Sequence, residues 1–459
     1  MKLSEKKIKK IIKNYNIQHR DDALNFIDDN PESLDIFELS RIAELVNNER
    51  TDTAAYYTDN SILETIGKFL PDINKKIIRV LEPAVGVGNF LQLIIDKYRS
   101  AEKLIIEVND IDPKSIEMVK VLNKYRNISK NVKIIYKNED FLSPFFNFED
   151  RKYDLVIGNP PFLKLSKHNG LSEYSTIFND KVTNNLSGFF LQKAIEISDY
   201  TALILPKYFL SNPNFSQTRN RVEKYSIDKV IDFGEKGFKG VLIETIALLV
   251  DTVKRPDTTI SYSVTMDYYN KQKQSKLTSS EFPYWLIYRD NFFDKIASEM
   301  TFSVFKVFRD RQLTNKVLKS QGEVRVLKSR NISRDGSGVI SIDGYNSYID
   351  RCDLDKFSVS KYYKRDDVYL SPNMTYYPRV IKKPRNTIVN GSVAILENVT
   401  DLDITDKHLA FLSSPIFENF YRIARNYSTR SLNIDSNSVQ FFGLYNGSME
   451  KLSKQQCED

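Results

Sequence analysis

The stretch "KIIRVLEPAVGVGNFLQLIIDKY", residues 76–98, places a strand pattern, a glycine-containing turn and a helix pattern in direct succession. Its first part is a short run of β-branched and other apolar residues, and its last part repeats apolar residues at helical spacing. Between them, Gly86 and Gly88 allow the backbone to turn tightly and to approach a ligand where a Cβ atom would clash. This succession indicates the beginning of an α/β domain.

Similar apolar runs recur along residues 53–255, with helical stretches between them. The six further runs are "KLIIEVND" (103–110), "VKIIYKNEDF" (132–141), "YDLVIGNPP" (153–161), "TALILP" (201–206), "KVIDFG" (229–234) and "TIALLV" (245–250). Because the runs are continuously apolar and alternate with helices, they favour a mostly parallel sheet covered on both faces. We therefore predict an α/β fold with a seven-stranded sheet in this part of the chain.

Length and composition limit the class of protein. A chain of 459 residues is too long for one typical core, so at least two domains are expected. No run of about 18 or more apolar residues is present, and the basic N-terminus lacks the apolar core of a signal peptide, so we expect a cytoplasmic protein. The two cysteines and three histidines are scattered, which disfavours a disulfide framework, a metal site or a histidine-based triad.

Positive charge is concentrated in the last third of the chain. Residues 301–459 contain 24 Lys and Arg against 18 Asp and Glu, a net +6 out of the +7 of the whole chain. Residues 361–385 interleave basic residues with five tyrosines. Basic residues with interleaved aromatic rings suit a polyanion whose bases can also be contacted. A solvated surface is an equally good explanation of a charge run alone.

The residues that end the predicted strands carry the candidate cofactor site, because parallel sheets bind ligands beyond the carboxyl ends of their strands. Glu82 and Pro83 end the first run, and a carboxylate at this place disfavours a pyrophosphate and favours a less anionic cofactor. Asp110 ends the second run, 22 residues after Gly88. Dinucleotide-binding folds place an acid that binds ribose hydroxyls about 20 residues after the glycine loop.

The third run ends in "NEDF", where Asp140 could accept a hydrogen bond from an adenine amino group and Phe141 could lie against the ring. Each position has a structural alternative: Asp110 or Asp112 could cap the following helix, and Phe141 could be a core residue. Together, the glycine loop and the two acids at successive strand ends predict a nucleoside cofactor.

The ordered set of motifs resembles the gamma class of S-adenosylmethionine-dependent DNA adenine-N6 methyltransferases, the TaqI-like group of type II restriction-modification systems. The motifs are "AAYYTD" (54–59), "EPAVGVGNFL" (82–91), "NDIDP" (109–113), "NEDF" (138–141) and "GNPPF" (158–162). The resemblance implies a Rossmann-like methyltransferase domain followed by a strand-rich α+β target-recognition domain. It covers residues 50–255 motif by motif, and the remainder more loosely.

On this basis the chain is expected to have four parts. Residues 1–50, with two amphipathic helical patterns, form an N-terminal helical extension. Residues 51–255 form the catalytic methyltransferase domain. Residues 256–300 are a connector, and residues 301–459 form the DNA target-recognition domain.

The resemblance implies S-adenosyl-L-methionine as the cofactor and assigns residues to its parts. Tyr57 and Thr58 would approach its methionine moiety, and Glu82, Gly86 and Gly88 would line the methionine and ribose region. Pro83, beside Glu82, is also expected to bind the cofactor. Asp110 would bind the ribose, and Asp140 and Phe141 would bind the adenine. The structural alternative for Thr58 is a plain helix N-cap.

The catalytic motif implied by the resemblance is Asn159, Pro160, Pro161 and Phe162. An adenine amino nitrogen is a poor nucleophile, and the Asn159 side-chain oxygen with the Pro160 carbonyl could accept its two hydrogens and localise its lone pair. Pro161 would fix this geometry, and Phe162 would stack on the extruded base. Taken alone, the motif could equally be a proline turn with Phe162 in the core.

Further residues are candidates for contact with the target base or with DNA. Phe238 would offer a second ring to the flipped adenine, although a buried aromatic residue explains it nearly as well. Lys207, after a strand end, could contact a phosphate or merely be exposed. In the basic segment 301–334, the candidates are Arg309, Arg311 and Arg330.

We therefore expect a site-specific adenine methyltransferase that acts as a monomer on double-stranded DNA and protects host DNA in a restriction-modification system. A cognate restriction endonuclease would act as a separate protein. The same Asn-Pro-Pro-aromatic motif occurs in enzymes that methylate protein glutamine or RNA, and a non-catalytic DNA-binding subunit is a further alternative. The basic C-terminal third favours DNA.

Overall fold

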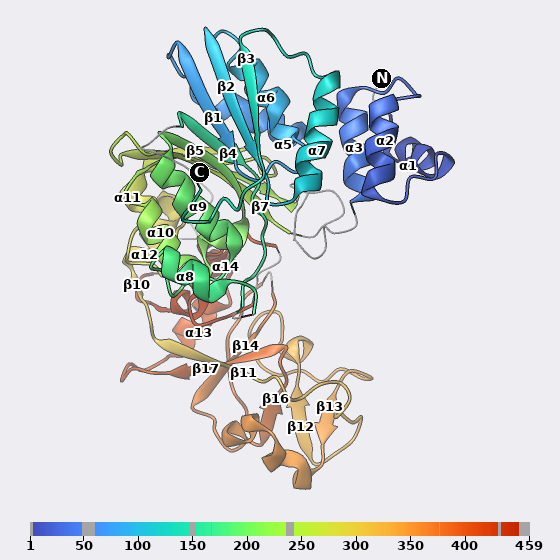
Figure 1. The fold of residues 1–459 in the computed structure, drawn as a ribbon. Helices are drawn as coiled ribbons and strands as arrows, with labels where there is room; N and C mark the ends of the chain where they lie inside the picture. The colour runs from blue at the N-terminus through green and yellow to red at the C-terminus, as the bar shows by residue number, and fades with distance from the viewer. Residues whose placement is uncertain are drawn as a thin grey trace. The chain divides into compact units, whose positions relative to one another are not determined.

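The computed structural model describes residues 3–47, 60–146, 153–166, 168–235, 243–375, 377–429 and 433–448. The chain divides into two compact units, Met1–Thr278 and Ser279–Asp459 (Figure 1). Within the described ranges, no helix is both long and apolar enough to cross a membrane.

The first unit is built on a nine-stranded sheet with the order β3-β2-β1-β4-β5-β7-β6-β8-β9 in the part of the chain that the structure describes. The strands are β1 (Ile77–Glu82), β2 (Lys103–Asn109), β3 (Val132–Lys137), β4 (Leu155–Gly158), β5 (Tyr200–Pro206), β6 (Ser226–Gly234), β7 (Thr245–Asp251), β8 (Thr258–Ser263) and β9 (Tyr268–Lys273). Strands β1 to β5 pair in parallel, and β7 is antiparallel to both of its neighbours. The prediction of a large, mostly parallel α/β sheet is confirmed.

All seven apolar runs are strands of this sheet, and β8 and β9 add two more at the edge formed by β6. Residues in β8 alternate between buried and partly exposed positions. This alternation is typical of an edge hairpin with one covered face, which explains why continuous apolar runs did not reveal it.

Helices lie on both sides of the sheet (Figure 1). They are α5 (Asn60–Phe69), α6 (Asn89–Lys97), α7 (Pro113–Leu122), α8 (Leu171–Ile177), α9 (Leu186–Ile197), α10 (Ser216–Val222) and α11 (Gln274–Leu277). Apolar residues of α5, α6 and α7 share one hydrophobic core with alternate residues of the central strands. Helix α9 packs on β5 and against α10.

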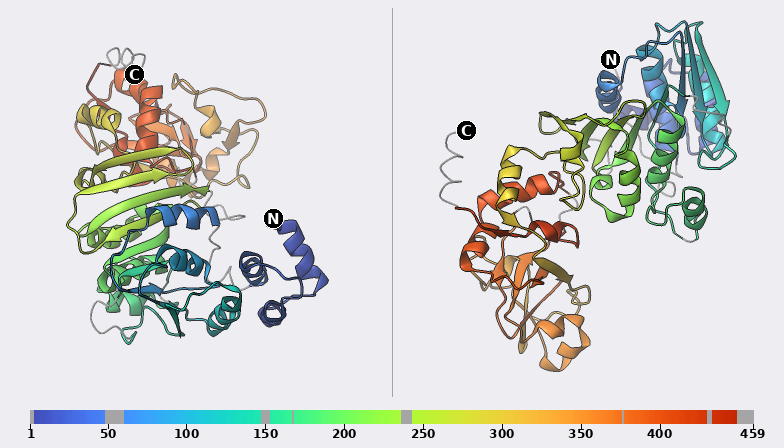
Figure 2. Two further views of the ribbon diagram at one scale, coloured as in Figure 1. Left: turned by 90° about the horizontal axis from the view of Figure 1, so that it is seen from above. Right: turned by 90° about the vertical axis from the view of Figure 1, so that its left-hand side faces the viewer.

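Within residues 3–47, the structure describes three helices, α1 (Glu5–Asn14), α2 (Arg20–Asp29) and α3 (Ile36–Val46). Figures 1 and 2 show these helices, coloured dark blue, beside α7. Their shared hydrophobic core includes Met118 and Leu122 of α7, and Val87 of the turn after β1 packs against it. The N-terminal helices are thus joined to the sheet through α7 and the glycine-containing turn.

The second unit combines small sheets with helices, as predicted for a strand-rich α+β fold. Its described helices are α12 (Asn291–Ser298), α13 (Asp406–Leu412) and α14 (Pro415–Ala424). Its strands are β10 (Met300–Thr301), β11 (Phe305–Arg309), β12 (Val324–Leu327), β13 (Ser347–Ile349), β14 (Val368–Pro372), β15 (Ile381–Lys382), β16 (Thr387–Val389), β17 (Val393–Asn398) and β18 (Leu444–Tyr445). They form the sheets β11-β17-β14-β15, β13-β12-β16 and β10-β18, and buried residues of the two larger sheets share one core.

Candidate cofactor site and catalytic motif

A cavity of about 360 Å³ lies at the carboxyl ends of β1, β2, β3 and β4. Residues from all four strand ends line it, as expected for a parallel sheet. The predicted site residues that the structure brings together in its wall are Glu82, Pro83, Gly86, Asp110, Asp140, Phe141, Asn159 and Pro161. Tyr57, Thr58 and Phe238 lie outside the described residues, so their predicted roles stay predictions.

Both glycines of the turn after β1 have left-handed backbone conformations, with φ of 55° at Gly86 and 76° at Gly88. An added Cβ atom at Gly86 would meet no described atom within 4 Å, whereas one at Gly88 would lie 2.9 Å from Leu91 Cδ1. Gly88, the N-cap of α6, thus combines a left-handed backbone with a contact that the Leu91 side chain would have to relieve. Gly86, which lines the cavity, leaves the backbone open to a ligand.

Asp110 ties two loops of the site together. Its carboxylate accepts hydrogen bonds from the backbone N–H of Gly86 at 2.9 Å and of Asp112 at 3.1 Å. Asp112, and not Asp110, caps α7 by accepting from Lys114 N. Burial raises the pKa of Asp110, and the backbone N–H groups partly offset this effect.

Glu82 is a buried acid at the end of β1, only 1% exposed. Its Oε2 atom has no hydrogen-bond partner among the described residues. Burial raises the pKa of Glu82 well above its usual value, while the charge of Arg126 opposes this shift. A positive charge in the cavity would favour the ionised form of Glu82, as the charge of Arg126 does, so the site fits a cofactor that carries a positive charge.

Asp140 and Phe141 follow β3 and face the cavity from another side. The Asp140 carboxylate accepts from the backbone N–H of Leu142 at 2.9 Å and from the Tyr174 hydroxyl at 3.3 Å. Burial, followed by the charge of Asp140, raises the pKa of Tyr174 to about 12. The Phe141 ring packs 5.0 Å from that of Phe190, so it serves the core as well as the cavity wall.

The predicted catalytic motif, residues 159–162, begins directly after β4. Asn159 is half-buried and lines the cavity with Pro161. Pro160 is buried, and Phe162 is 6% exposed and belongs to the core between the sheet and its helices. This burial corresponds to the core alternative for Phe162, and its stacking on a base stays a prediction. Asn185 secures the turn, since its Nδ2 donates to the Phe162 carbonyl at 3.0 Å.

Lys207 follows β5 and is buried, not exposed, with 5% of its surface accessible. Its ammonium group lies 2.7 Å from Asp232 Oδ2 and 3.4 Å from Glu244 Oε1. Two carboxylates from neighbouring strand ends thus hold this charge inside the protein. A contact between Lys207 and a DNA phosphate stays a prediction.

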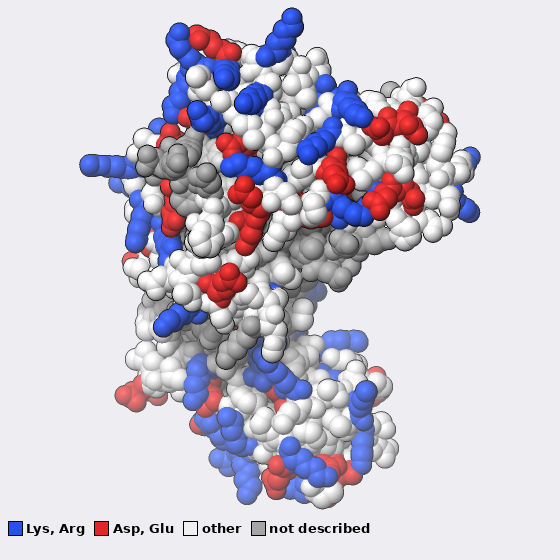
Figure 3. All heavy atoms as spheres, viewed as in Figure 1, with Lys and Arg blue, Asp and Glu red and all other residues white. Residues whose placement is uncertain are grey.

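The predicted arginines of the second unit differ in exposure. Arg311 and Arg330 are exposed, whereas Arg309 is partly buried, and burial lowers its pKa. The Arg330 guanidinium stacks 4.7 Å from the Tyr345 ring centroid, which Lys328 also approaches at 3.9 Å. Figure 3 shows Lys and Arg side chains along the surface of this unit, interspersed with Asp and Glu.

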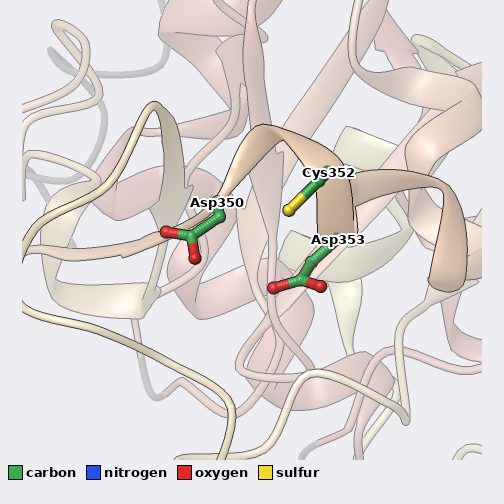
Figure 4. A group of neighbouring side chains, drawn as sticks. All are labelled: Asp350, Cys352 and Asp353. Carbon is green, nitrogen blue, oxygen red and sulfur yellow. The ribbon is translucent and has the colours of Figure 1, made fainter.

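One group of acidic and thiol side chains in the described ranges brings its atoms within 4.8 Å of one another: Asp350, Cys352 and Asp353 (Figure 4). Asp350 forms an ion pair with Lys319, and Asp353 pairs with Lys356 at 2.6 Å. These lysines account for both carboxylates, and we assign no metal to the group.

The sequence motifs missed several residues that line the cavity. Tyr174 comes from α8, whereas Arg20 and Glu44 come from the N-terminal helices α2 and α3. The one sequence signal for Glu44 is its place beside Ala43 on the buried face of α3, where a charged residue is unusual. Nothing in the sequence marked Arg20.

Comparisons with known proteins point to restriction-modification methyltransferases. Residues 22–238 match the family described as Eco57I restriction-modification methylase. Two curated relatives are each 28% identical: the type II methyltransferase M.CvrRI of Paramecium bursaria Chlorella virus XZ-6E over 178 residues, and the type II methyltransferase M.AccI of Acinetobacter calcoaceticus over 211 residues. The alignments cover 38% and 44% of this chain, and 41% and 37% of the relatives. The chain thus spans about two fifths of the length of each relative.

A solved structure, that of the type IIG restriction endonuclease BpuSI, is similar over 92% of this chain and 62% of its own. The sequence identity is 12% and the TM-score is 0.48.

Proposed function

We propose that this chain, which belongs through residues 22–238 to the Eco57I restriction-modification methylase family, methylates the N6 amino group of an adenine in duplex DNA. The methyl donor is S-adenosyl-L-methionine, the cofactor that the family and the α/β fold imply. The adenine is turned out of the helix into the cavity, because its amino group cannot be reached within the base stack. The modified sites are protected from a restriction endonuclease that acts as a separate protein.

One arrangement carries this proposal: Asn159 lines the same cavity as the acids Glu82, Asp110 and Asp140. The Asn159 side chain offers a hydrogen-bond acceptor at the end of β4. The three acids come from the ends of β1, β2 and β3 and suit a positively charged nucleoside. An acceptor for an amino group therefore lies beside a site suited to this cofactor.

The chemistry required of the protein is positioning. The Asn159 side-chain oxygen and the Pro160 carbonyl accept the two amino hydrogens of the adenine, which localises its nitrogen lone pair. Pro161 fixes the backbone. Asn185, the N-cap of α9, donates a hydrogen bond to the carbonyl of the next residue, Phe162. When bound, S-adenosyl-L-methionine supplies a methyl group already activated by its sulfonium, so proximity and alignment account for most of the acceleration.

The cofactor is held by the turn and loops described above. Glu82 and the Gly86 backbone bind its methionine and ribose region, with Tyr57 and Thr58 from the preceding segment. Asp110 binds the ribose hydroxyls, and Asp140 with Tyr174 binds the adenine amino edge. Phe162 and Phe238 face the target base.

The second unit serves as the target-recognition domain, and the protein acts on DNA as a monomer. Exposed Arg311 and Arg330 supply positive charge for the phosphate backbone. The Tyr345 ring, which Lys328 and Arg330 both approach, combines charge with an aromatic side chain. Such a combination suits nucleic acid better than an acidic protein.

The test is transfer of a labelled methyl group from S-adenosyl-L-methionine to duplex DNA by the full chain. We expect label at adenine N6 with the wild-type protein and loss of transfer by at least about 100-fold in Asn159→Ala, because the acceptor for the amino group is removed. Cofactor binding by Asn159→Ala, measured by calorimetry, should remain.

The control is Asn127→Ala, which truncates an exposed asparagine outside the cavity wall and should transfer label at the wild-type rate. RNA and a protein substrate with exposed glutamine are offered in parallel. Label on either of these with DNA inert would overturn the proposed substrate.

A further inference from the structure

The N-terminal helices contribute to the wall of the cofactor cavity, a role that the methyltransferase motifs do not assign. Arg20 is the first residue of α2, Glu44 lies in the last turn of α3, and Asn47 follows that helix. All three line the cavity together with the strand-end residues. The segment before the first motif is therefore part of the site and not only an extension of it.

Glu44 holds the far end of the glycine-containing turn. Glu44 is 2% exposed, and its Oε1 accepts a hydrogen bond from Asn89 Nδ2 at 2.8 Å. Asn89 is the first residue of α6 and directly follows Gly88. Arg41 donates to the other oxygen of Glu44 at 3.2 Å, and also pairs with Glu5 of α1 at 3.1 Å. The acceptor for Asn89 is thus fixed by two N-terminal helices.

Arg20 holds the loop that presents the ribose-binding acid. Its guanidinium forms an ion pair with Asp112 and donates to Ser115 Oγ at 3.3 Å. The backbone N–H of Asp112 in turn donates to the Asp110 carboxylate. Arg20 therefore acts on Asp110 through the residue two positions later.

An apolar contact joins these two polar ones. Val87 lies between Gly86 and Gly88 and packs against the hydrophobic core of α1, α2 and α3. The turn after β1 is therefore held at its middle by Val87, at its end by Glu44 through Asn89, and on its far side by Arg20 through the Asp110 loop. Each of these contacts starts from the N-terminal helices.

We propose that Arg20 and Glu44 are positioning residues for the cofactor, through which the N-terminal helices set the affinity of the cavity for S-adenosyl-L-methionine. The inference rests on the proposed function in one respect, the identity of the cofactor. It makes no use of the DNA substrate. Without the contact of Arg20 or of Glu44, one of the two loops that bind the ligand is no longer held in its binding conformation. Ordering that loop on binding then lowers the affinity.

The test is titration calorimetry of the full chain with S-adenosyl-L-methionine and with S-adenosyl-L-homocysteine, without DNA. Arg20→Ala and Glu44→Ala should each raise the dissociation constants of both ligands about tenfold, because each loses a partly buried, charge-assisted hydrogen bond. Glu44→Gln keeps an acceptor for Asn89 and should recover most of the affinity. Asn89→Ala removes the donor of the same hydrogen bond. It therefore tests this contact even if Glu44→Ala does not fold.

The matched control is Asp21→Asn. Asp21 adjoins Arg20 in α2 and pairs with Lys114 of α7 at 2.8 Å, but this exposed pair is outside the cavity wall. Its removal should change the dissociation constants less than about twofold. The double variant Glu44→Ala with Asn89→Ala should bind no more weakly than Glu44→Ala alone, as expected for residues that act through each other.

Three results separate the inference from the proposed function. If the wild-type protein binds the cofactor and Arg20→Ala, Glu44→Ala and Asn89→Ala bind it equally well, the inference is overturned and the proposed function stands. An equal loss of affinity in Asp21→Asn would also overturn it, because helix docking in general would then explain the effect. If the wild-type protein binds neither ligand, the assignment of the cavity itself fails.

Discussion

At the scale of single residues, the acids of the cavity differ in whether both of their carboxylate oxygens accept hydrogen bonds from the protein. Both oxygens of Asp110 accept backbone hydrogen bonds, and Asp140 accepts from a tyrosine and a backbone N–H. Glu82 instead has a buried oxygen without a hydrogen-bond partner in the described ranges. Arg126, whose Nη2 donates to the Gly88 carbonyl at 2.8 Å, opposes the raised pKa of Glu82 only in part. Glu82 is therefore the residue whose protonation should respond most to a charged ligand.

The affinity for S-adenosyl-L-methionine should depend on pH through Glu82. Between the ordinary pKa of a glutamate and the raised pKa in the folded protein, Glu82 is protonated in the free protein, whereas a bound cation favours its ionised form. Binding then releases a proton, so affinity should rise with pH until the raised pKa is passed. Calorimetry in two buffers of different ionisation enthalpy measures this proton directly. Glu82→Gln should release none, and proton release unchanged in that variant would contradict the assignment.

The same shift affects stability with the opposite sign. In the cofactor-free protein the raised pKa of Glu82 contributes to the free energy of unfolding. This contribution is complete at pH values below the ordinary pKa of a glutamate, and it is lost as the pH rises through the raised pKa of the folded protein. The difference in free energy of unfolding between the cofactor complex and the free protein should therefore grow as the pH increases.

At the scale of elements, the turn between β1 and α6 has two glycines with different duties. Both have positive φ, but an added Cβ atom would have open space at Gly86 and a contact of 2.9 Å at Gly88. The neighbouring elements fix this turn, since Asp110 accepts from the Gly86 N–H and Asn89 donates to Glu44. Gly88 is the N-cap of α6 and is closely packed, whereas Gly86 has open space in the cavity wall.

Alanine at each glycine should separate these duties. Gly88→Ala should reduce the free energy of unfolding of the first unit by about 2 kcal/mol, since the left-handed backbone costs about 1–2 kcal/mol and the contact with Leu91 adds to it. Gly86→Ala carries the backbone cost alone, but places a methyl group where the cofactor approaches and should weaken its binding about tenfold or more. Urea denaturation and calorimetry give the two quantities. Equal effects of both variants in both measurements would contradict this division.

The elements also show which structure could be predicted. All seven apolar runs are strands, because continuous burial leaves a direct mark on sequence. The acids at three strand ends line one cavity, since the carboxyl ends of parallel strands meet at one edge. The hairpin of β8 and β9 lies in residues 256–300, where a connector and a return to strands were predicted, but its pairing with β6 at the edge of the main sheet was not predicted. Lys207 is buried because Asp232 and Glu244, distant in sequence, meet it in space.

At the scale of the whole molecule, the two units divide the proposed work. The first unit contains the cavity and the predicted catalytic motif, and its N-terminal helices complete the cavity wall through Arg20 and Glu44. That contribution was not predictable, because it depends on how α2 and α3 dock on α7 and not on a motif. The second unit supplies the exposed arginines and the basic aromatic cluster at Tyr345.

DNA binding should depend on the exposed charges of the second unit. Arg311→Glu and Arg330→Glu should each weaken binding to duplex DNA. Each should also make the slope of log affinity against log salt shallower by about 1, because a protein with one phosphate contact fewer releases fewer counterions on binding. Binding isotherms at several salt concentrations measure both effects. Arg99→Glu, an exposed arginine of the first unit with 70% of its side chain accessible, is the control and should leave the slope unchanged. Slopes unaffected by both second-unit variants would remove the recognition role from this surface.

The central claim is tested most directly by mapping modified bases in DNA from cells that express this chain or its Asn159→Ala variant. The account predicts N6-methyladenine within one short sequence context in the first DNA and its absence from the second. Unmodified DNA from cells that contain the folded, cofactor-binding wild-type protein would contradict it, as would methylation at another base or an identical pattern from the Asn159→Ala variant.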